Sequence, residues 1–136
     1  MRVLSDTFTL NNGLKIPKIG FGTAPLKGEA AYEAVNHAIA LGYKHIDTAQ
    51  NYLNEQDVGR AMKDSPFNRE DFFITSKLRA EIKNPETVRP AFFETLNALQ
   101  TDYLDLFIIH APWPWDEKFA DYSEENIAVY KELEKL

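Results

Sequence analysis

The sequence predicts an α/β fold, a parallel (β/α) barrel of which the chain holds an N-terminal hairpin and the first four strand-helix units. Three observations predict it. Short apolar segments alternate with amphipathic helical segments, which favours a parallel sheet with right-handed crossovers. Small or polar residues directly follow the apolar segments, as they do where barrel enzymes place their active sites. The fourth segment, residues 104–110, is almost entirely apolar, as expected of a strand buried on both faces.

The first element is a predicted β-hairpin. Residues 8–10 and 14–16 alternate between apolar and polar side chains, and Asn12-Gly13 lies between them. This dipeptide tolerates the positive φ angles of a tight turn. We expect the hairpin to close the bottom of the barrel.

The strand-helix units follow Pro17. The predicted strands cover residues 18–22, 44–47, 72–77 and 104–110. The first helix is predicted over residues 30–41, with Gly42 at the position where a left-handed residue ends a helix. The second is predicted from an N-cap at Asn54 to about Lys63, before Ser65-Pro66.

The last two helices have clear beginnings. Asn84 is a candidate N-cap followed by Pro85 at the first helical position, a combination typical of helix N-termini. The apolar face of this helix consists of Val88, Phe92, Leu96 and Leu99. The fourth helix is predicted from Ser123 to the chain end, without a C-cap and with an apolar face of Ile127, Tyr130, Leu133 and Leu136.

Length sets the main limit on this prediction. A complete eightfold barrel typically needs about 250 residues, whereas the chain has 136. We therefore expect one domain, residues 1–136, that forms half of a barrel. The outer strands of half a barrel would leave backbone groups unpaired, so self-association or pairing with a missing C-terminal half is expected.

Composition excludes several classes of function. The net charge of −6 and the pI near 5.0 argue against nucleic-acid binding, which requires excess Lys and Arg. No apolar run resembles a signal peptide or approaches the ~18 residues of a membrane span, so a cytoplasmic protein is expected. No metal site is expected, because the chain has no cysteine and three scattered histidines.

Four polar residues at or just after the predicted strand ends indicate chemistry. They are Asp47, Tyr52, Lys77 and His110. A cation beside a phenol stabilises the phenolate, and Lys77 can supply that cation while Asp47 pairs with it. Tyr52 can then donate a proton to a carbonyl oxygen that His110 orients.

Each of these residues has a structural alternative when it is considered alone. A tyrosine before a helix is more often a surface residue, and His110 can equally be a core histidine. An aromatic cluster follows His110, consisting of Trp113, Trp115, Phe119 and Tyr122. A pocket wall is favoured for this cluster, and packing within the loop is an alternative of similar weight.

The chain resembles the aldo-keto reductase family. The resemblance rests on the segments Gly42–Ala49 with Tyr52, Asn54-Glu55 and Val58-Gly59, on Ile74–Leu78, and on Asp102–Leu106 with Ile109-His110. It implies a (β/α)₈ barrel of the TIM type and an NADPH-dependent reductase of aldehyde or ketone carbonyls. It also implies a catalytic tetrad of Tyr52, Asp47, Lys77 and His110, with Tyr52 as the proton donor.

The same resemblance implies the binding residues. Gly22, Thr23 and Asp47 would contact the nicotinamide side of the cofactor, and Trp113 would line the substrate pocket. Ala24, Arg79 and Ala111 stand where many members carry tryptophan, which implies a wider or more polar pocket. A second hypothesis remains, in which the chain is a non-catalytic half-barrel scaffold or a truncated fragment that self-associates.

Overall fold

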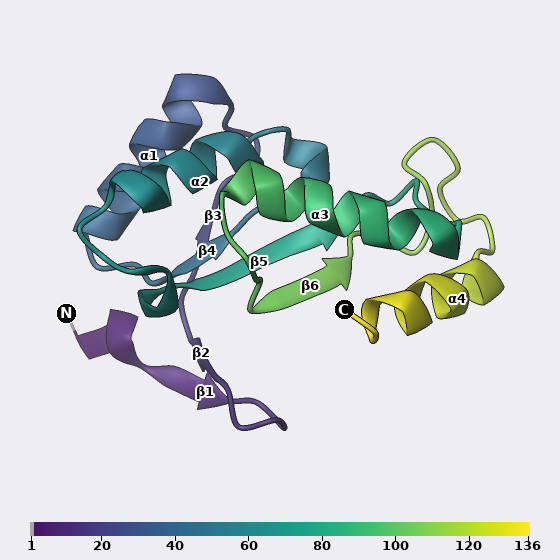
Figure 1. Cartoon of the computed structure of the whole chain (residues 1–136), viewed down its shortest axis with the longest axis horizontal. Coiled ribbons are helices and arrows are strands. Elements are labelled where there is room, and N and C mark those ends of the chain that lie inside the picture. Colours follow the sequence, from purple (N-terminus) through teal and green to yellow (C-terminus); the bar gives the residue numbers. More distant parts are fainter. Residues whose placement is uncertain (1) are drawn as a thin grey trace.

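The structure, a computed structural model, describes residues 2–136 (Figure 1). The strands are β1 (Thr7–Thr9), β2 (Lys15–Pro17), β3 (Phe21–Gly22), β4 (His45–Asp47), β5 (Phe73–Leu78) and β6 (Leu106–Ile109). The helices are α1 (Gly28–Ala40), α2 (Glu55–Asp64), α3 (Val88–Leu99) and α4 (Ser123–Leu133). Short 3₁₀ turns occupy η1 (Arg2–Ser5), η2 (Gln50–Tyr52), η3 (Arg69–Asp71) and η4 (Pro85–Thr87).

The predicted hairpin is confirmed as the antiparallel pair β1 and β2, in which Phe8 lies opposite Ile16. Gly13 has a φ of 86°, and the Asn12 side chain accepts a hydrogen bond from the amide of Leu14. A small cavity lies between the β2 side of the hairpin and the beginnings of β4, β5 and β6. The hairpin therefore lies at the bottom of the sheet, as expected.

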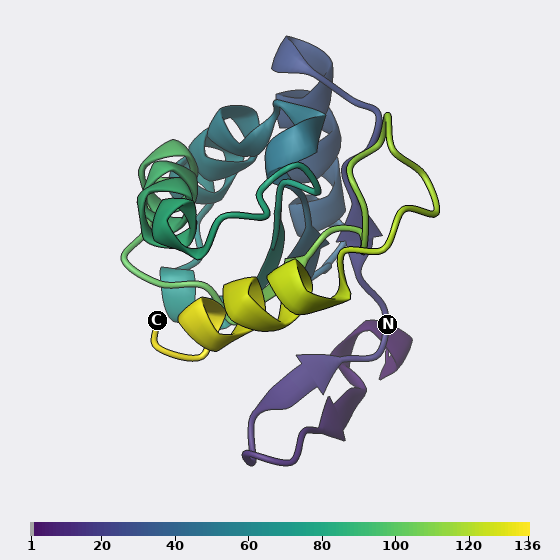
Figure 2. The same ribbon diagram turned by 90° about the vertical axis from the view of Figure 1, so that its right-hand side faces the viewer.

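The four remaining strands form one parallel sheet in the order β3-β4-β5-β6. Gly22 is opposite Asp47, and Asp47 is opposite Thr75. The helices α1, α2, α3 and α4 form an arc around this sheet (Figure 2). The strands β3 and β6 are its two edges, so the arrangement corresponds to half of a barrel.

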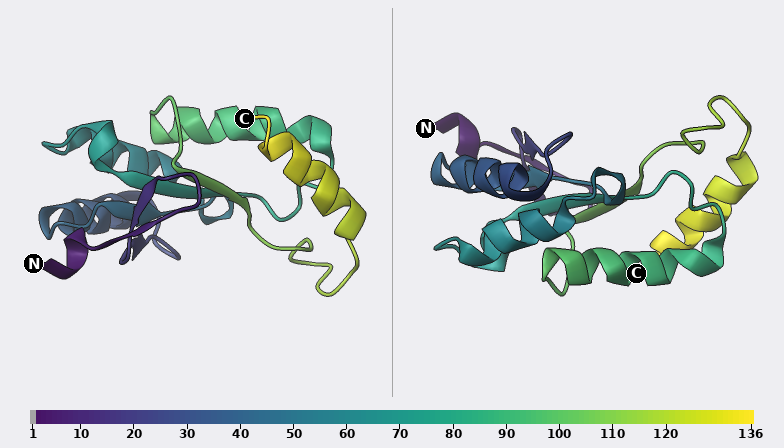
Figure 3. Two further views of the ribbon diagram at one scale, coloured as in Figure 1. Left: turned by 90° about the horizontal axis from the view of Figure 1, so that it is seen from below. Right: turned by 90° about the horizontal axis from the view of Figure 1, so that it is seen from above.

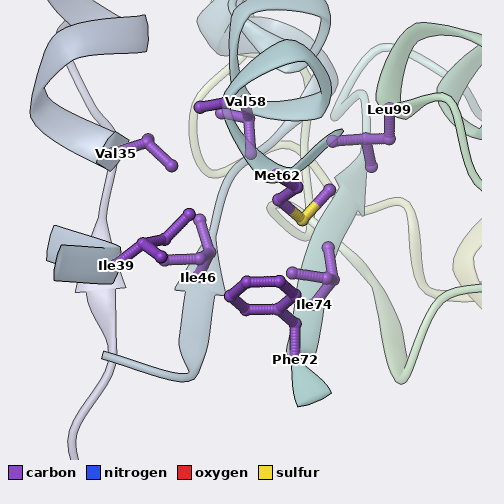
Figure 4. Packing of buried hydrophobic residues seen from close by; sticks show 9 residues of the cluster. Val35, Ile39, Ile46, Val58, Met62, Phe72, Ile74 and Leu99 are labelled. Atoms are coloured by element: carbon purple, nitrogen blue, oxygen red, sulfur yellow. The ribbon is translucent and has the colours of Figure 1, made fainter. Parts of the chain in front are cut away.

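The core lies between the sheet and the helices on its outer face. Its main cluster consists of Val35, Ile39, Ile46, Val58, Ala61, Met62, Phe72, Ile74 and Leu99 (Figure 4). Gly59 allows α2 to approach α3 closely, because a Cβ atom at this position would lie 2.6 Å from the backbone of Leu99. The packing fixes the strands whose carboxyl ends carry the polar residues.

Several predicted elements differ from the structure in their bounds. The helix predicted after Asn84 begins with the 3₁₀ turn η4 and is α-helical only from Val88, and the strand predicted over residues 104–110 is Leu106–Ile109. The strand expected over residues 18–22 is only Phe21–Gly22. Helix α4 ends at Leu133, and its buried residue is Val129, whereas Ile127 and Tyr130 are 58% and 56% exposed. The predicted face was wrong for these two residues, because α4 packs on β6, η4 and α3 through Val129 and Leu133, while Ile127 and Tyr130 line an open hollow beside Ile109.

Candidate active site

The centre of the site is an ion pair between adjacent strands. Lys77 Nζ donates to Asp47 Oδ1 at 2.5 Å and to the carbonyl oxygen of Thr48 at 2.8 Å. Asp47 and Thr75 are register partners, and Lys77 lies two residues beyond Thr75, so it projects from the same face of β5. The side chain of Lys77 is only 12% exposed. A mostly buried ammonium is thus held by one carboxylate and one carbonyl.

Tyr52 lies beside this ammonium. It ends the short turn η2 after β4, and its hydroxyl oxygen is 3.5 Å from Lys77 Nζ. The ammonium is also 5.0 Å from the centre of the phenol ring. Lys77 therefore links the carboxylate of Asp47 to the phenol of Tyr52, which is the order of contacts that the sequence predicted.

His110 completes the group directly after β6. Its ring packs edge to face on Tyr52, with centroids 5.4 Å apart, and on Trp115 at 5.3 Å. Burial and the nearby Lys77 lower the pKa of His110, an effect that Asp47 and Glu81 partly offset. Its buried Nδ1 has no hydrogen-bond partner among the described residues. The imidazole is therefore neutral near pH 7.

This environment predicts a pH dependence. The pKa of His110 should lie below its ordinary value of 6.5, so the unfolded chain takes up the proton first, and acidification through pH 6.5 should reduce the stability of the fold. NMR titration of the imidazole measures the pKa directly. Lys77→Met should raise it by removing a positive charge, whereas Lys118→Met in the exposed loop should leave it unchanged. Titration of His110 at or above 6.5 in the unsubstituted chain would contradict this environment.

A second layer of buried polar side chains supports the four residues of the candidate site. Asn54 is at the N-cap position of α2, as predicted, but it is fully buried and its side chain makes no capping hydrogen bond. Its Oδ1 accepts from Thr48 Oγ1 at 2.7 Å, and its Nδ2 donates to the carbonyls of Thr23 and Leu26. The side-chain amide of Asn54 therefore connects the loops after β3 and β4. Because its oxygen and nitrogen are used in these bonds, it does not cap α2.

Two more residues of this layer were missed by sequence reasoning. The Glu55 carboxylate accepts hydrogen bonds from Ser76 and Thr95, and burial raises its pKa despite these bonds. The Gln50 side chain donates to the carbonyl of Ala91 and accepts from the amide of Arg79. Such contacts between distant segments have no local sequence signal. The only indication was that Asn54-Glu55 belongs to the motif behind the family resemblance.

The predicted cofactor residues lie at the same end of the sheet. Gly22 is exposed, and a side chain there would meet no atom within 4 Å. Thr23 is fully buried. Its amide and Oγ1 both donate to the carbonyl of Asp47, and its own carbonyl accepts from Asn54. Thr23 therefore positions Asp47 and offers no free donor of its own.

The residues predicted to bind substrate differ in exposure. Ala24 and Arg79 are exposed, and Ala111 is buried. The positive charge of Arg79 lowers the pKa of Glu55, whereas the negative charge of Glu81 raises the pKa of His110; in each case the larger effect of burial is opposite. Trp113 packs on Phe119, with ring centroids 5.0 Å apart, and Trp115 is the indole that contacts His110. Sequence reasoning included Trp115 in the aromatic cluster but did not single it out, and it missed Glu81.

Comparison with known proteins identifies the family. The model of the aldo/keto reductase family matches residues 18–136. The chain belongs to the aldo-keto reductase family. It is 43% identical over 134 residues to a glyoxal reductase of Bacillus subtilis (strain 168), a match that covers 98% of this chain and 45% of the relative. It is 42% identical to the aldehyde reductase YPR1 of Saccharomyces cerevisiae, covering 96% and 40% of the two chains.

Solved structures give the same result for the fold. The crystal structure of an aldo/keto reductase from Brucella melitensis superposes with a TM-score of 0.86 at 37% identity, covering 96% of this chain and 48% of that chain. The family fold is thus confirmed for β3 to α4 as half of a TIM-type barrel. The chain spans less than half the length of the curated relatives it matches.

Residues 2–136 contain neither a helix suited to a membrane nor a cluster suited to a metal ion. No helix in this range has the length and apolar character that crossing a bilayer requires. The same residues contain no group of three or more acidic, histidine or cysteine side chains that could hold a metal ion.

Proposed function

We propose that this chain supplies the catalytic half of an NADPH-dependent oxidoreductase that reduces aldehyde or ketone carbonyls to alcohols. The observation that carries the proposal is the contact of Lys77 with both Asp47 and Tyr52, next to the neutral His110. The names of its relatives agree with this function. They include a glyoxal reductase, an aldehyde reductase and an NAD(P)H-dependent D-xylose reductase.

The side chains divide the chemistry among them. The Tyr52 phenol donates its proton to the carbonyl oxygen, and the adjacent Lys77 ammonium stabilises the phenolate that remains. Asp47 and the carbonyl of Thr48 hold Lys77 in place. A nitrogen of the neutral His110 ring binds and orients the substrate oxygen. The Tyr52 and Trp115 rings on either side of His110 limit the positions that the substrate can take.

The residues present fit the reduced nicotinamide cofactor, which supplies the hydride when bound. Gly22 leaves open space above the backbone, and its register partner is Asp47. A flat ring can lie against such a glycine. We propose that Gly22 and Asp47 contact the nicotinamide, while Thr23 keeps both in register through its two hydrogen bonds to Asp47. NADPH is proposed as this cofactor on the family resemblance alone.

The function can be tested in a completed barrel. Residues 1–136 would be joined to the part of the Bacillus subtilis glyoxal reductase that lies beyond the match. Oxidation of NADPH in the presence of glyoxal and of benzaldehyde should then be readily measured by absorbance. A folded chimera that binds NADPH but reduces no carbonyl would contradict the proposal.

We further propose that residues 1–136 form one domain that pairs with a second half-barrel. The alternative function, a non-catalytic scaffold, also requires such pairing, because the enzyme and the scaffold would both pair through the open edges of the sheet. Ile108 on β6 is 38% exposed, and Ile127 and Tyr130 on α4 are more exposed still. Exposed apolar area of this kind typically marks an interaction surface. Location in the cytoplasm stays a prediction.

This surface predicts self-association of the isolated chain. Sedimentation at micromolar concentration should show species larger than the 15.6 kDa monomer. Ile127→Lys should weaken the association because it places a charge on the exposed apolar face of α4. Glu124→Lys, which changes an already polar position on the same helix, is the matched control. A compact and well-folded monomer would show that the exposed face needs no partner.

A further inference from the structure

The segment after His110 is held by two side chains that have no part in the proposed chemistry. Residues 111–122, here called the aromatic loop, join β6 to α4 and extend beyond the ends of the strands (Figure 3). The loop carries Trp115, which packs on His110, and Trp113, which packs on Phe119. Its root and its end are both near Lys83, which lies in the segment between β5 and η4.

Lys83 and Asn126 form a connected set of contacts with the loop. Lys83 Nζ donates to Asn126 Oδ1 at 2.7 Å and to the carbonyl of Ala111 at 3.3 Å. Asn126 Nδ2 donates to the carbonyl of Pro112 at 2.7 Å. The ammonium also lies 5.6 Å from the ring centre of Tyr122, at the other end of the loop.

The loop has few other polar attachments. Two backbone hydrogen bonds lie within the loop, from Glu117 to Pro114 and from Ala120 to Glu117. At its end, the Asn126 amide donates to the carbonyl of Tyr122, and Ser123 donates to the Asp121 side chain. Among residues 2–136, two side chains outside the loop donate hydrogen bonds to its carbonyl groups, those of Lys83 and Asn126. Pro112 and Pro114 have no amide to donate. At the loop root, the carbonyls of Ala111 and Pro112 are therefore bound by these two side chains.

Burial agrees with a role for Lys83 inside the structure. Its side chain is half-buried, and desolvation lowers its pKa, with the opposite effect from Glu81 and Glu125. An ammonium loses hydration in such a place, and it is retained where it makes directed hydrogen bonds. Lys83 thus differs from a solvated surface lysine, whose ammonium projects into water.

We propose that Lys83 and Asn126 act as a latch that holds the aromatic loop against His110, and that this latch determines the substrate range. The two are positioning residues, since neither touches the reacting atoms. The latch fixes the position of Trp115, which forms a wall of the proposed substrate pocket. It therefore affects the binding of carbonyl substrates that are large enough to contact this indole. This specificity role rests on the proposed reductase function, whereas the holding of the loop does not.

The chain offers a direct probe of the loop. It contains two tryptophans, Trp113 and Trp115, and both lie in the aromatic loop. Acrylamide quenching and fluorescence anisotropy of the purified chain therefore report on this loop. Lys83→Met and Asn126→Leu should each raise the population of the loosened loop by up to roughly tenfold, seen as stronger quenching and lower anisotropy. The double variant should add little, because both substitutions break the same latch.

Matched variants separate this role from general destabilisation. Lys118→Met removes a lysine from the exposed part of the loop and should leave quenching unchanged. Lys83→Arg keeps a cationic donor and should restore most of the protection. Far-UV circular dichroism shows whether each variant is folded. Wild-type quenching in a folded Lys83→Met variant would overturn the latch.

Kinetics in the completed barrel test the specificity role. Lys83→Met should raise KM for benzaldehyde by roughly tenfold while changing kcat and the constants for glyoxal much less. Equal losses for both substrates would overturn the assignment of the latch to substrate range. Absence of any turnover in the unsubstituted chimera, together with altered quenching in Lys83→Met, would reject the reductase function and retain the latch.

Discussion

Tyr52→Phe is expected to lower kcat for carbonyl reduction by about 10²–10⁴-fold in the completed barrel. The substitution removes one oxygen, the group that lies 3.5 Å from Lys77 Nζ, and retains the ring that packs on His110. Affinity for NADPH should be nearly unchanged, because Gly22 and Asp47 are not altered. Steady-state kinetics and a cofactor titration measure the two quantities separately.

The control for this substitution is another tyrosine of the chain. Tyr122→Phe also removes a hydroxyl, which donates to Glu117, but it lies in the aromatic loop away from Lys77. It should keep kcat within a few-fold of the original value. Turnover of Tyr52→Phe at the wild-type rate would remove Tyr52 from the role of proton donor.

Most of the fold could be predicted from the sequence because its signals are local. Asn12-Gly13 indicated the hairpin, Gly42 ends α1 with a φ of 99°, and the Asn84 side chain accepts from the amide of Glu86 as predicted. The alternation of strands and helices gave the parallel sheet. Each of these features depends on residues that are close together in the chain.

The errors came from residues whose environment is set by distant segments. Asn54 has the right position for an N-cap, but contacts with Thr23 and Leu26 use its side chain instead. The pattern along α4 suggested that Ile127 and Tyr130 are buried, although both are exposed in the structure. Periodicity shows which residues share a face of a helix and does not show which partner that face meets.

The same division applies to the candidate site. Asp47, Tyr52, Lys77 and His110 were found because each is at or just after the end of a strand, where a barrel places its reacting groups. The supporting layer of Gln50, Asn54 and Glu55 joins segments 21 to 45 residues apart. Such pairings become visible only when the strands are placed side by side.

The isolated chain is expected to bind NADPH orders of magnitude more weakly than the completed barrel. Residues 1–136 hold the groups proposed for the nicotinamide, whereas the family resemblance assigns the phosphate contacts mainly to later strands. The loss of several charge-assisted contacts, at about 1.5–3 kcal/mol each, accounts for an effect of this size. Reduction requires the hydride donor and the carbonyl to be held together. The four groups proposed to be catalytic should therefore give no turnover alone.

The most direct test is one assay of NADPH oxidation with glyoxal under three conditions. It compares residues 1–136 alone, the same chain mixed with the separately produced C-terminal half of the Bacillus subtilis glyoxal reductase, and the fused chimera. We expect no measurable activity from the chain alone and clear activity from the fused chimera, with partial recovery in the mixture. Robust reduction by residues 1–136 alone, or binding of NADPH to them at micromolar concentration, would contradict the view that this half-barrel contributes the acid and relies on a second half for the cofactor.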